Sequence, residues 1–197
     1  MRRDFIYLAS ASPRRQTLLE QIGVPFRLRP SQVLEARDAG ETPEDCVMRL
    51  AKAKADAVWD TLAASDARPV LAADTLVVID DEVLGKPTDA HDAMAMLARL
   101  SGRSHRVLTG VVLRYRDRVL SRLNTSEVRF RATTSEERIA YCETGEPMGK
   151  AGSYAIQGRG AILVEHLNGS FSSVMGLPLA ETAALLQELG FPVWEHR

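Results

Sequence analysis

Two long runs that are expected as strands, about 106–116 and 118–130, follow each other with only the turn Arg116-Asp117 between them. A connection this short joins antiparallel neighbours, so the two runs predict a long hairpin. Elsewhere, short apolar runs alternate with apolar residues at helical spacing. The combination favours an α/β fold, with a mixed twisted sheet, flanking helices and two lobes around a cleft.

Capping and turn residues place the remaining elements. Helices are expected from Pro13 behind the N-cap Ser12, and from Thr42, Thr88 and Thr134, because hydroxyl residues there precede helical spacing. A last helix is expected between Pro178 and Gly190. Shorter strands are expected at about 5–8, 26–30, 69–73, 75–79, 154–156 and 161–167.

The bulk composition excludes several classes of protein. The chain has 197 residues, of which 45% are hydrophobic and 26% charged, and we expect one globular domain over 1–197. A net charge of −1 argues against a dedicated nucleic-acid binder. No apolar run approaches the roughly 18 residues of a membrane span, and no signal-peptide pattern opens the chain. The two cysteines, Cys46 and Cys142, fall in expected helices and suit a reducing compartment, so a cytoplasmic location is expected.

The segment from Ser10 to Arg15 carries the clearest functional signal. A strand is expected to end in the hydroxyls of Ser10 and Ser12, and Pro13 opens a helix whose first turn holds Arg14 and Arg15. Cations are disfavoured at a helix N-terminus by about 0.3–1 kcal/mol each. Free N–H groups, hydroxyls and two guanidinium groups together suit a bound polyanion, so this turn is a candidate phosphate site.

Other candidates each have a functional and a plain structural interpretation. Asp74, between two apolar runs, could hold a metal or activate water as a general base, or could bond its own backbone in a turn. Lys86, in the turn Gly85–Pro87, could contact phosphate or be solvated. Lys52 and Lys54 cannot share a helix face, so one of them could reach a site while the other faces solvent. Glu35 lies in a polar loop and could be only a solvated acid.

Several familiar motifs are absent from the sequence. There is no Walker A pattern, no G-x-G-x-x-G and no H-E-x-x-H, which removes the common nucleotide cradles and zinc hydrolase sites. Two glycine-dense segments, 145–152 and 156–160, could form either a lid over a ligand or ordinary loops.

Taken together, these segments resemble the Maf family of nucleoside triphosphate pyrophosphatases, which are related to the inosine triphosphatase fold. The resemblance runs from about Leu8 to Leu189. The motifs that carry it are Leu8-Ala9-Ser10-x-Ser12-Pro13-Arg14-Arg15, the helix with Lys54, Ala73-Asp74-Thr75, Gly85-Lys86-Pro87, Leu100-Ser101-Gly102-x-x-His105-x-Val107-x-Thr109-Gly110 and Val174-Met175-Gly176-Leu177-Pro178.

The resemblance implies metal-assisted hydrolysis of a nucleoside triphosphate to its monophosphate and pyrophosphate. Asp74 would activate the water and, with Glu35, hold a divalent cation, Mg²⁺ or Mn²⁺. The phosphates would be bound by Ser10 and by the basic residues Arg14, Arg15, Lys54 and Lys86. A homodimer is also implied, with no nucleic-acid or membrane partner.

The segment Glu146-Pro147-Met148-x-Lys150-Ala151-Gly152-x-Tyr154-x-Ile156-Gln157-Gly158 resembles the branch of the family that acts on dTTP and UTP. In that branch Arg14, Thr75 and Gln157 would set the base preference, and the Gln157 amide can both donate and accept along a pyrimidine edge. The alternatives are a pyrophosphatase for 7-methyl-GTP or another modified purine nucleotide, and a nucleotide-binding regulator of cell division.

Overall fold

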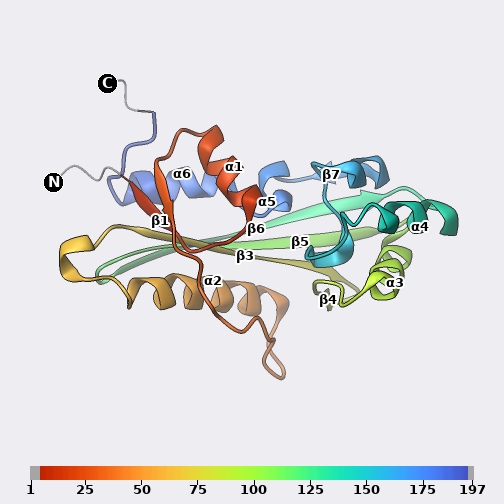
Figure 1. Cartoon of the computed structure of the whole chain (residues 1–197), viewed down its shortest axis with the longest axis horizontal. Coiled ribbons are helices and arrows are strands. Elements are labelled where there is room, and N and C mark those ends of the chain that lie inside the picture. Colours follow the sequence, from red (N-terminus) through yellow and green to blue (C-terminus); the bar gives the residue numbers. More distant parts are fainter. Residues whose placement is uncertain (1–4, 195–197) are drawn as a thin grey trace. The chain divides into compact units, whose positions relative to one another are not determined.

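A computed structural model describes residues 5–194 (Figure 1). Its sheet has seven strands in the order β2-β1-β3-β5-β6-β7, and β4 pairs with β3. β1 is parallel to β2 and β3, whereas the β3/β4 and β6/β7 pairs are antiparallel. The sheet is therefore mixed and the fold is α/β, as the sequence predicted.

The chain forms two compact units. Unit 1 comprises residues 5–74, 109–124 and 176–194, and unit 2 comprises residues 75–108 and 125–175. The chain passes between them inside three strands, after Asp74, Leu108 and Asn124. Those strands are β3 (Val70–Ile79), β5 (Ser104–Tyr115) and β6 (Arg118–Phe130).

Unit 1 places helices on both faces of its strands. Figure 1 shows α2 on one face and α1 and α6 on the other. The α2 face is built from alanines and Val58, which pack on Tyr7, Val70 and Val112. Its complete elements are β1 (Ile6–Leu8), α1 (Pro13–Gln21), β2 (Phe26–Leu28), α2 (Pro43–Trp59), a short 3₁₀ turn (Ala64–Asp66) and α6 (Leu179–Glu188).

Unit 2 has its own apolar core. Val77, Leu97, Val107 and Phe130 are buried in it with Tyr154, and each of these side chains has little contact with water. Its complete elements are β4 (Glu82–Leu84), α3 (Ala90–Leu100), α4 (Ser135–Glu143), two 3₁₀ segments (Ala151–Ser153 and Arg159–Leu163), β7 (Val164–Asn168) and α5 (Phe171–Met175).

Local sequence signals explain most element ends. Thr42 caps α2 by accepting a hydrogen bond from the Asp45 amide at 3.1 Å, and Pro43 begins the helix. Thr134 and Glu137 form a capping box at α4. Asp80 and Asp81 have φ values of 52° and 60°, which match the primed turns that close tight hairpins, here between β3 and β4.

Four sequence-based expectations are corrected. The runs 69–73 and 75–79 form one strand, β3, because Asp74 and Thr75 continue the extended backbone. Asp89, not Thr88, caps α3, since its carboxylate accepts from the Asp92 amide at 2.8 Å. Residues 154–156 are not a strand. In the run expected as a strand over 161–167, residues up to Leu163 are a 3₁₀ turn and only Val164 onward pair with β6.

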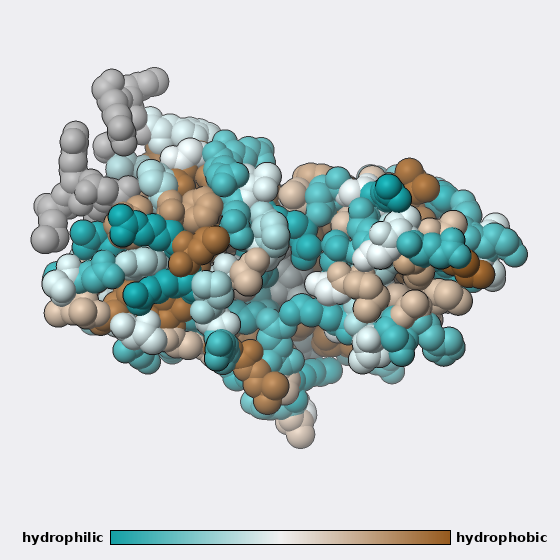
Figure 2. Space-filling model, viewed as in Figure 1, coloured by the Kyte–Doolittle hydropathy of each residue, from teal (hydrophilic) through white to brown (hydrophobic). Residues whose placement is uncertain are grey.

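On the face drawn in Figure 2, hydrophilic side chains predominate and apolar ones are scattered. Within residues 5–194, no helix is long and apolar enough to cross a membrane.

Candidate active site

The turn from β1 into α1 is organised by Ser10. The Ser10 hydroxyl oxygen is buried and accepts hydrogen bonds from the Ser12 amide at 3.1 Å and from Arg15 Nη1 at 3.2 Å. Ser12 is the N-cap residue by position, but its side chain makes no capping hydrogen bond. Ser12 is thus the N-cap by position, as the sequence predicted, and the Ser10 hydroxyl holds the Ser12 amide and the Arg15 side chain.

Arg15 is fixed from two sides. Its Nε donates to the carbonyl oxygen of Gly176 at 2.7 Å, while Nη1 donates to Ser10. Two directed hydrogen bonds hold the plane of the guanidinium group, which a lysine could not reproduce. Burial lowers the pKa of Arg15 and also that of Arg14. The first turn of α1 contains Arg14 and Arg15 and no acidic residue. Positive charge is therefore concentrated at this helix N-terminus, as the sequence predicted.

Lys54 joins two carboxylates that are far apart in the sequence. Its Nζ donates to Asp74 Oδ1 at 2.5 Å and also to Glu35 Oε1. Lys54 and Asp74 are 6% and 5% exposed, whereas the side chain of Glu35 is more open to solvent. Lys52, by contrast, is exposed and pairs with Asp56 one turn further along α2. Lys52 is therefore the lysine that faces solvent, and Lys54 is the one that lies beside Asp74 and Glu35.

Asp74 lies in the middle of β3 rather than at a strand end, which corrects the expected position. Burial raises the pKa of its carboxyl group, and the charge of Glu35 acts in the same direction. The charges of Lys54 and Arg15 lower that pKa and favour the ionised form. Asp74 is therefore a desolvated carboxylate with two cations nearby that favour its ionised form.

The donor set at Asp74 and Glu35 fits a divalent metal that binds through few protein ligands. Within residues 5–194 there is no group of three or more His, Cys, Asp or Glu side chains that could hold a metal alone. Mg²⁺ commonly binds through one or two carboxylates and takes its other oxygens from water and substrate phosphates. Two carboxylates that meet at one ammonium group match that pattern.

The remaining predicted residues belong to unit 2. Thr75 follows Asp74 directly in β3 and is partly buried. Lys86 and Gln157 are exposed, Lys86 just after β4 and Gln157 in a turn between two 3₁₀ segments. The other predicted site residues all lie in unit 1: Ser10, Arg14, Arg15, Glu35, Lys54 and Asp74. The roles of Thr75, Lys86 and Gln157 stay predictions.

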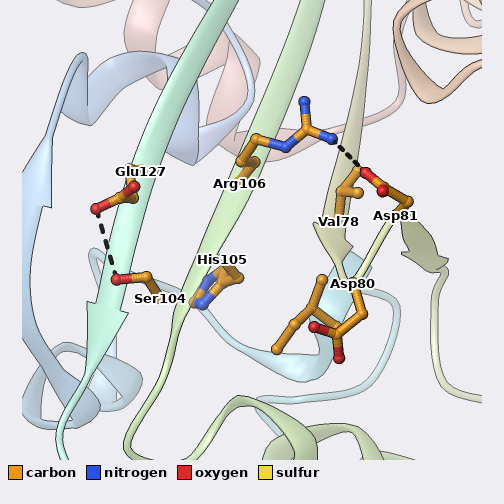
Figure 3. Close-up of a pocket in the computed structure, with 8 residues that line it drawn as sticks. Val78, Asp80, Asp81, Ser104, His105, Arg106 and Glu127 are labelled. Carbon is orange, nitrogen blue, oxygen red and sulfur yellow. Dashed lines mark hydrogen bonds and ion pairs between the residues drawn. The ribbon is translucent and has the colours of Figure 1, made fainter.

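A pocket of about 210 Å³ in unit 2 contains none of these residues (Figure 3). Two of its three acids are paired, Asp80 with Arg103 at 2.6 Å and Asp81 with Arg106 at 3.2 Å, while Glu127 accepts from the Ser104 hydroxyl at 3.5 Å. Burial lowers the pKa of His105, which also lines the pocket, to about 4. Its volume is below the roughly 300 Å³ of small ligand sites, and its lining holds three acids but only one arginine. We therefore place the candidate active site in unit 1.

Two glycines that sequence reasoning gave no role support the site. The carbonyl of Gly176 fixes Arg15. Gly110 on β5 lets α2 approach closely, since a Cβ atom there would lie 3.0 Å from the carbonyl oxygen of Val47 and from Met48 Sδ. Gly110 ends the motif Leu100–Gly110, and Gly176 lies in the motif Val174–Pro178. Their presence in these two motifs was the sequence signal that could have identified them.

The chain is similar in sequence to a known family of proteins. The model of the family described as Maf-like protein matches residues 5–189. A dTTP/UTP pyrophosphatase of Burkholderia thailandensis is 51% identical over 193 residues, which cover 93% of this chain and 92% of the relative. Proteins of the same name from Burkholderia orbicola and Ralstonia nicotianae are 53% and 50% identical over 192 residues each. These alignments cover 92% and 93% of this chain, and 91% and 93% of the two relatives.

The solved structure of the Staphylococcus aureus Ham1 protein is a more distant match, with a TM-score of 0.41 and 14% identity over 64% of this chain and 71% of that one. The family match spans nearly all described residues and includes every part of the candidate site. The chain therefore belongs to the Maf family.

Proposed function

We propose that this protein hydrolyses dTTP and UTP to the nucleoside monophosphate and pyrophosphate. The observation that carries the proposal is the buried Lys54–Asp74 pair, with Glu35 on the same ammonium group. It places a desolvated carboxylate beside an ammonium group, and Arg15 adds a second positive charge near Asp74. Water attack on a polyphosphate needs a carboxylate and cations together in this way. The names of relatives at 50–53% identity support the same activity and the choice of nucleotide.

In the proposed reaction Asp74 takes a proton from the attacking water. Oδ1 of Asp74 is held by Lys54, which orients the carboxylate and leaves Oδ2 as the atom that receives the proton. Burial makes the carboxylate more basic than an exposed aspartate, because desolvation disfavours its charged form. Such positioned general bases typically contribute about 10²–10⁴-fold to the rate.

The phosphates of the substrate carry several negative charges, and the basic residues would bind them. Arg15 presents a fixed guanidinium group, Arg14 lies beside it in the first turn of α1, and Lys54 adds an ammonium group. Lys86 is the proposed fourth cation. Negative charge that develops on the departing pyrophosphate would be stabilised by these groups.

A divalent metal bound by Asp74 and Glu35 would supply Lewis-acid polarisation of the phosphoryl oxygens. Arg14, Thr75 and Gln157 are the proposed determinants of base preference. A homodimer, a cytoplasmic location and the absence of a nucleic-acid partner stay predictions from the sequence.

The test is pyrophosphate release from dTTP, UTP, dCTP, dATP, GTP and 7-methyl-GTP with Mg²⁺ or Mn²⁺. We expect turnover of dTTP and UTP, loss of turnover when EDTA removes the metal, and a fall of at least about 100-fold in kcat for Asp74→Asn. Asp117→Asn is the control, since Asp117 is an exposed acid in the β5–β6 turn. Release confined to 7-methyl-GTP would contradict the proposed substrate, and binding without any release would favour a regulatory protein.

A further inference from the structure

Gln157 is presented by a tight turn. The Gly158 amide donates to the carbonyl oxygen of Ala155 at 3.1 Å, so Ile156 and Gln157 are the two central residues of a β-turn. Ile156 is buried and Gln157 is exposed. The direction in which the Gln157 amide points therefore depends on what fixes the two ends of this turn.

The carboxylate of Glu146 fixes the outgoing end. Oε2 accepts from the Arg159 amide at 3.0 Å, and Oε1 accepts from the Gly160 amide at 3.0 Å. Oε1 also accepts from the hydroxyl group of Tyr141 at 2.8 Å. Hydrogen bonds to an ionised acceptor are about twice as strong as those between neutral groups, so this end of the turn is held firmly.

Tyr141 extends the same network to the incoming end. Its hydroxyl oxygen accepts from the Ala155 amide at 3.2 Å while its proton is donated to Glu146. Tyr141 is buried at the end of α4, and Glu146 follows on the turn after that helix, where its amide donates to Thr144 Oγ1 at 3.1 Å. The turn that carries Gln157 is thus tied to α4 at Ala155, through Tyr141, and to the turn after α4 at Arg159 and Gly160, through Glu146.

The two glycines that follow Gln157 are required by these contacts. A Cβ atom at Gly158 would lie 2.3 Å from Glu146 Oε2, and one at Gly160 would lie 2.7 Å from the Tyr141 hydroxyl and 2.9 Å from the carbonyl oxygen of Ala155. All three distances are shorter than real Cβ contacts. Close approach of Glu146 and Tyr141 therefore explains the two glycines of the segment 156–160.

Glu146 remains charged in this setting. Burial alone would raise the pKa of its carboxyl group, but the hydrogen bonds from Gly160, Tyr141 and Arg159 outweigh burial and lower it. The Glu146 carboxylate is therefore ionised across the neutral pH range and can accept the hydrogen bonds of the turn.

We propose that Glu146 is a positioning residue for base recognition, which acts by holding the turn that presents Gln157 and not by touching the substrate. This inference rests on the proposed function, because it takes Gln157 as a determinant of base preference. Removal of the carboxylate should let the Gln157 amide turn away from the base while the phosphate-binding residues and Asp74 of unit 1 are unchanged.

The experiment compares Glu146→Ala, Tyr141→Phe and Gln157→Ala, with Glu143→Ala as a matched exposed acid on α4. Steady-state kcat and KM are measured for dTTP, UTP and dCTP. We expect Glu146→Ala to raise KM for dTTP about tenfold, to reduce discrimination against dCTP and to change kcat by less than about threefold, since truncation removes the acceptor of the Arg159 and Gly160 amides and leaves Asp74 in place. Tyr141→Phe should give a smaller change in the same direction and keeps the test valid if Glu146→Ala does not fold. Glu146→Gln keeps one acceptor and should restore part of the preference.

A double variant checks that Glu146 acts through Gln157. If it does, Glu146→Ala combined with Gln157→Ala should discriminate no worse than Gln157→Ala alone, because coupled residues are not additive. Amide hydrogen exchange at Ala155, Arg159 and Gly160 should accelerate in Glu146→Ala and not in Glu143→Ala. That readout does not depend on turnover.

The outcomes separate the two proposals. If the natural protein releases no pyrophosphate from dTTP or UTP, the proposed function fails, and with it the base-recognition role of Glu146, whatever the exchange result. If the natural protein is active but Glu146→Ala keeps its preference for dTTP over dCTP, or lowers kcat equally for all three nucleotides, the positioning role is wrong and the proposed function stands.

Discussion

Lys54 lies between the two acids of the candidate site, because its ammonium group is shared between Asp74 and Glu35. Its charge lowers the pKa of Asp74 against the larger effect of burial, and the charge of Arg15 acts in the same direction as Lys54. In the proposed mechanism Lys54 therefore couples acid–base chemistry to phosphate binding. This coupling has a measurable consequence in the pH dependence of the reaction.

Replacement of Lys54 by methionine should shift the acid limb of the kcat/KM profile to higher pH. The Asp74 pKa is raised by burial and lowered by Lys54, so loss of the ammonium group raises that pKa further. Because the base must be ionised, activity disappears as pH falls through this pKa, and that fall should begin at a higher pH in the variant. The measurement is log kcat/KM for dTTP against pH. Lys52→Met, which changes the exposed lysine of the same helix, should leave the limb in place; an unmoved limb in Lys54→Met would contradict the role given to Asp74.

At the scale of elements, α1 and α2 deliver their charges by different means. α1 presents Arg14 and Arg15 in its first turn, and the local signal of Ser12 and Pro13 is enough to begin it. α2 must instead lie close against the sheet, so that Lys54 reaches Asp74 in β3. Gly110 on β5 permits that approach, because it places no side chain opposite Val47 and Met48 of α2.

Gly110→Ala should therefore lower both stability and activity. The added methyl group would press on the Val47 carbonyl, which as helix backbone yields only by a shift of α2, and overpacking of this kind costs about 1–3 kcal/mol. We expect a lower midpoint of thermal unfolding and a lower kcat/KM. Gly85→Ala is the control for stability, since a Cβ atom there meets nothing within 4 Å. A Gly110→Ala variant as stable and active as the natural protein would show that α2 does not depend on this contact.

For the whole molecule, the important feature is where the chain crosses between its two units. Three of the crossings lie inside β3, β5 and β6, and not in flexible linkers. Each unit also has its own buried apolar cluster, so the connection through strands decides whether they behave as one domain. Domain boundaries usually fall in exposed linkers, which these strands are not.

We accordingly expect one cooperative unfolding transition for both units. Trp59 and Trp194 belong to unit 1, and Cys142 belongs to unit 2, so fluorescence and thiol reactivity report on different units. In a Cys46→Ser background, urea titrations followed by tryptophan fluorescence, by Cys142 reactivity and by circular dichroism should give coincident midpoints. Separate midpoints would identify two independently stable domains and contradict the single domain expected from the sequence.

Most elements could be predicted from the sequence because their signals are local. Thr42, Pro43 and the capping box at Thr134 act within one helical turn, and the β5–β6 hairpin follows from a two-residue connection. The errors occurred where a local signal was ambiguous. Asp74 and Thr75 suggested a break in what is one strand, and Tyr154 to Ile156 are apolar because they enter a buried turn, not a strand.

The sequence by itself determined the family, the α/β class and the identity of the basic and acidic residues, because these depend on residue type and spacing along the chain. Only the tertiary structure decided which of those residues meet. Lys54 pairs with both Glu35 and Asp74, and Arg15 donates hydrogen bonds to Ser10 and Gly176. Glu146 accepts hydrogen bonds from the end of the turn that carries Gln157. Contacts between residues distant in the chain depend on how helices and strands pack, and no local pattern of residues specifies that packing.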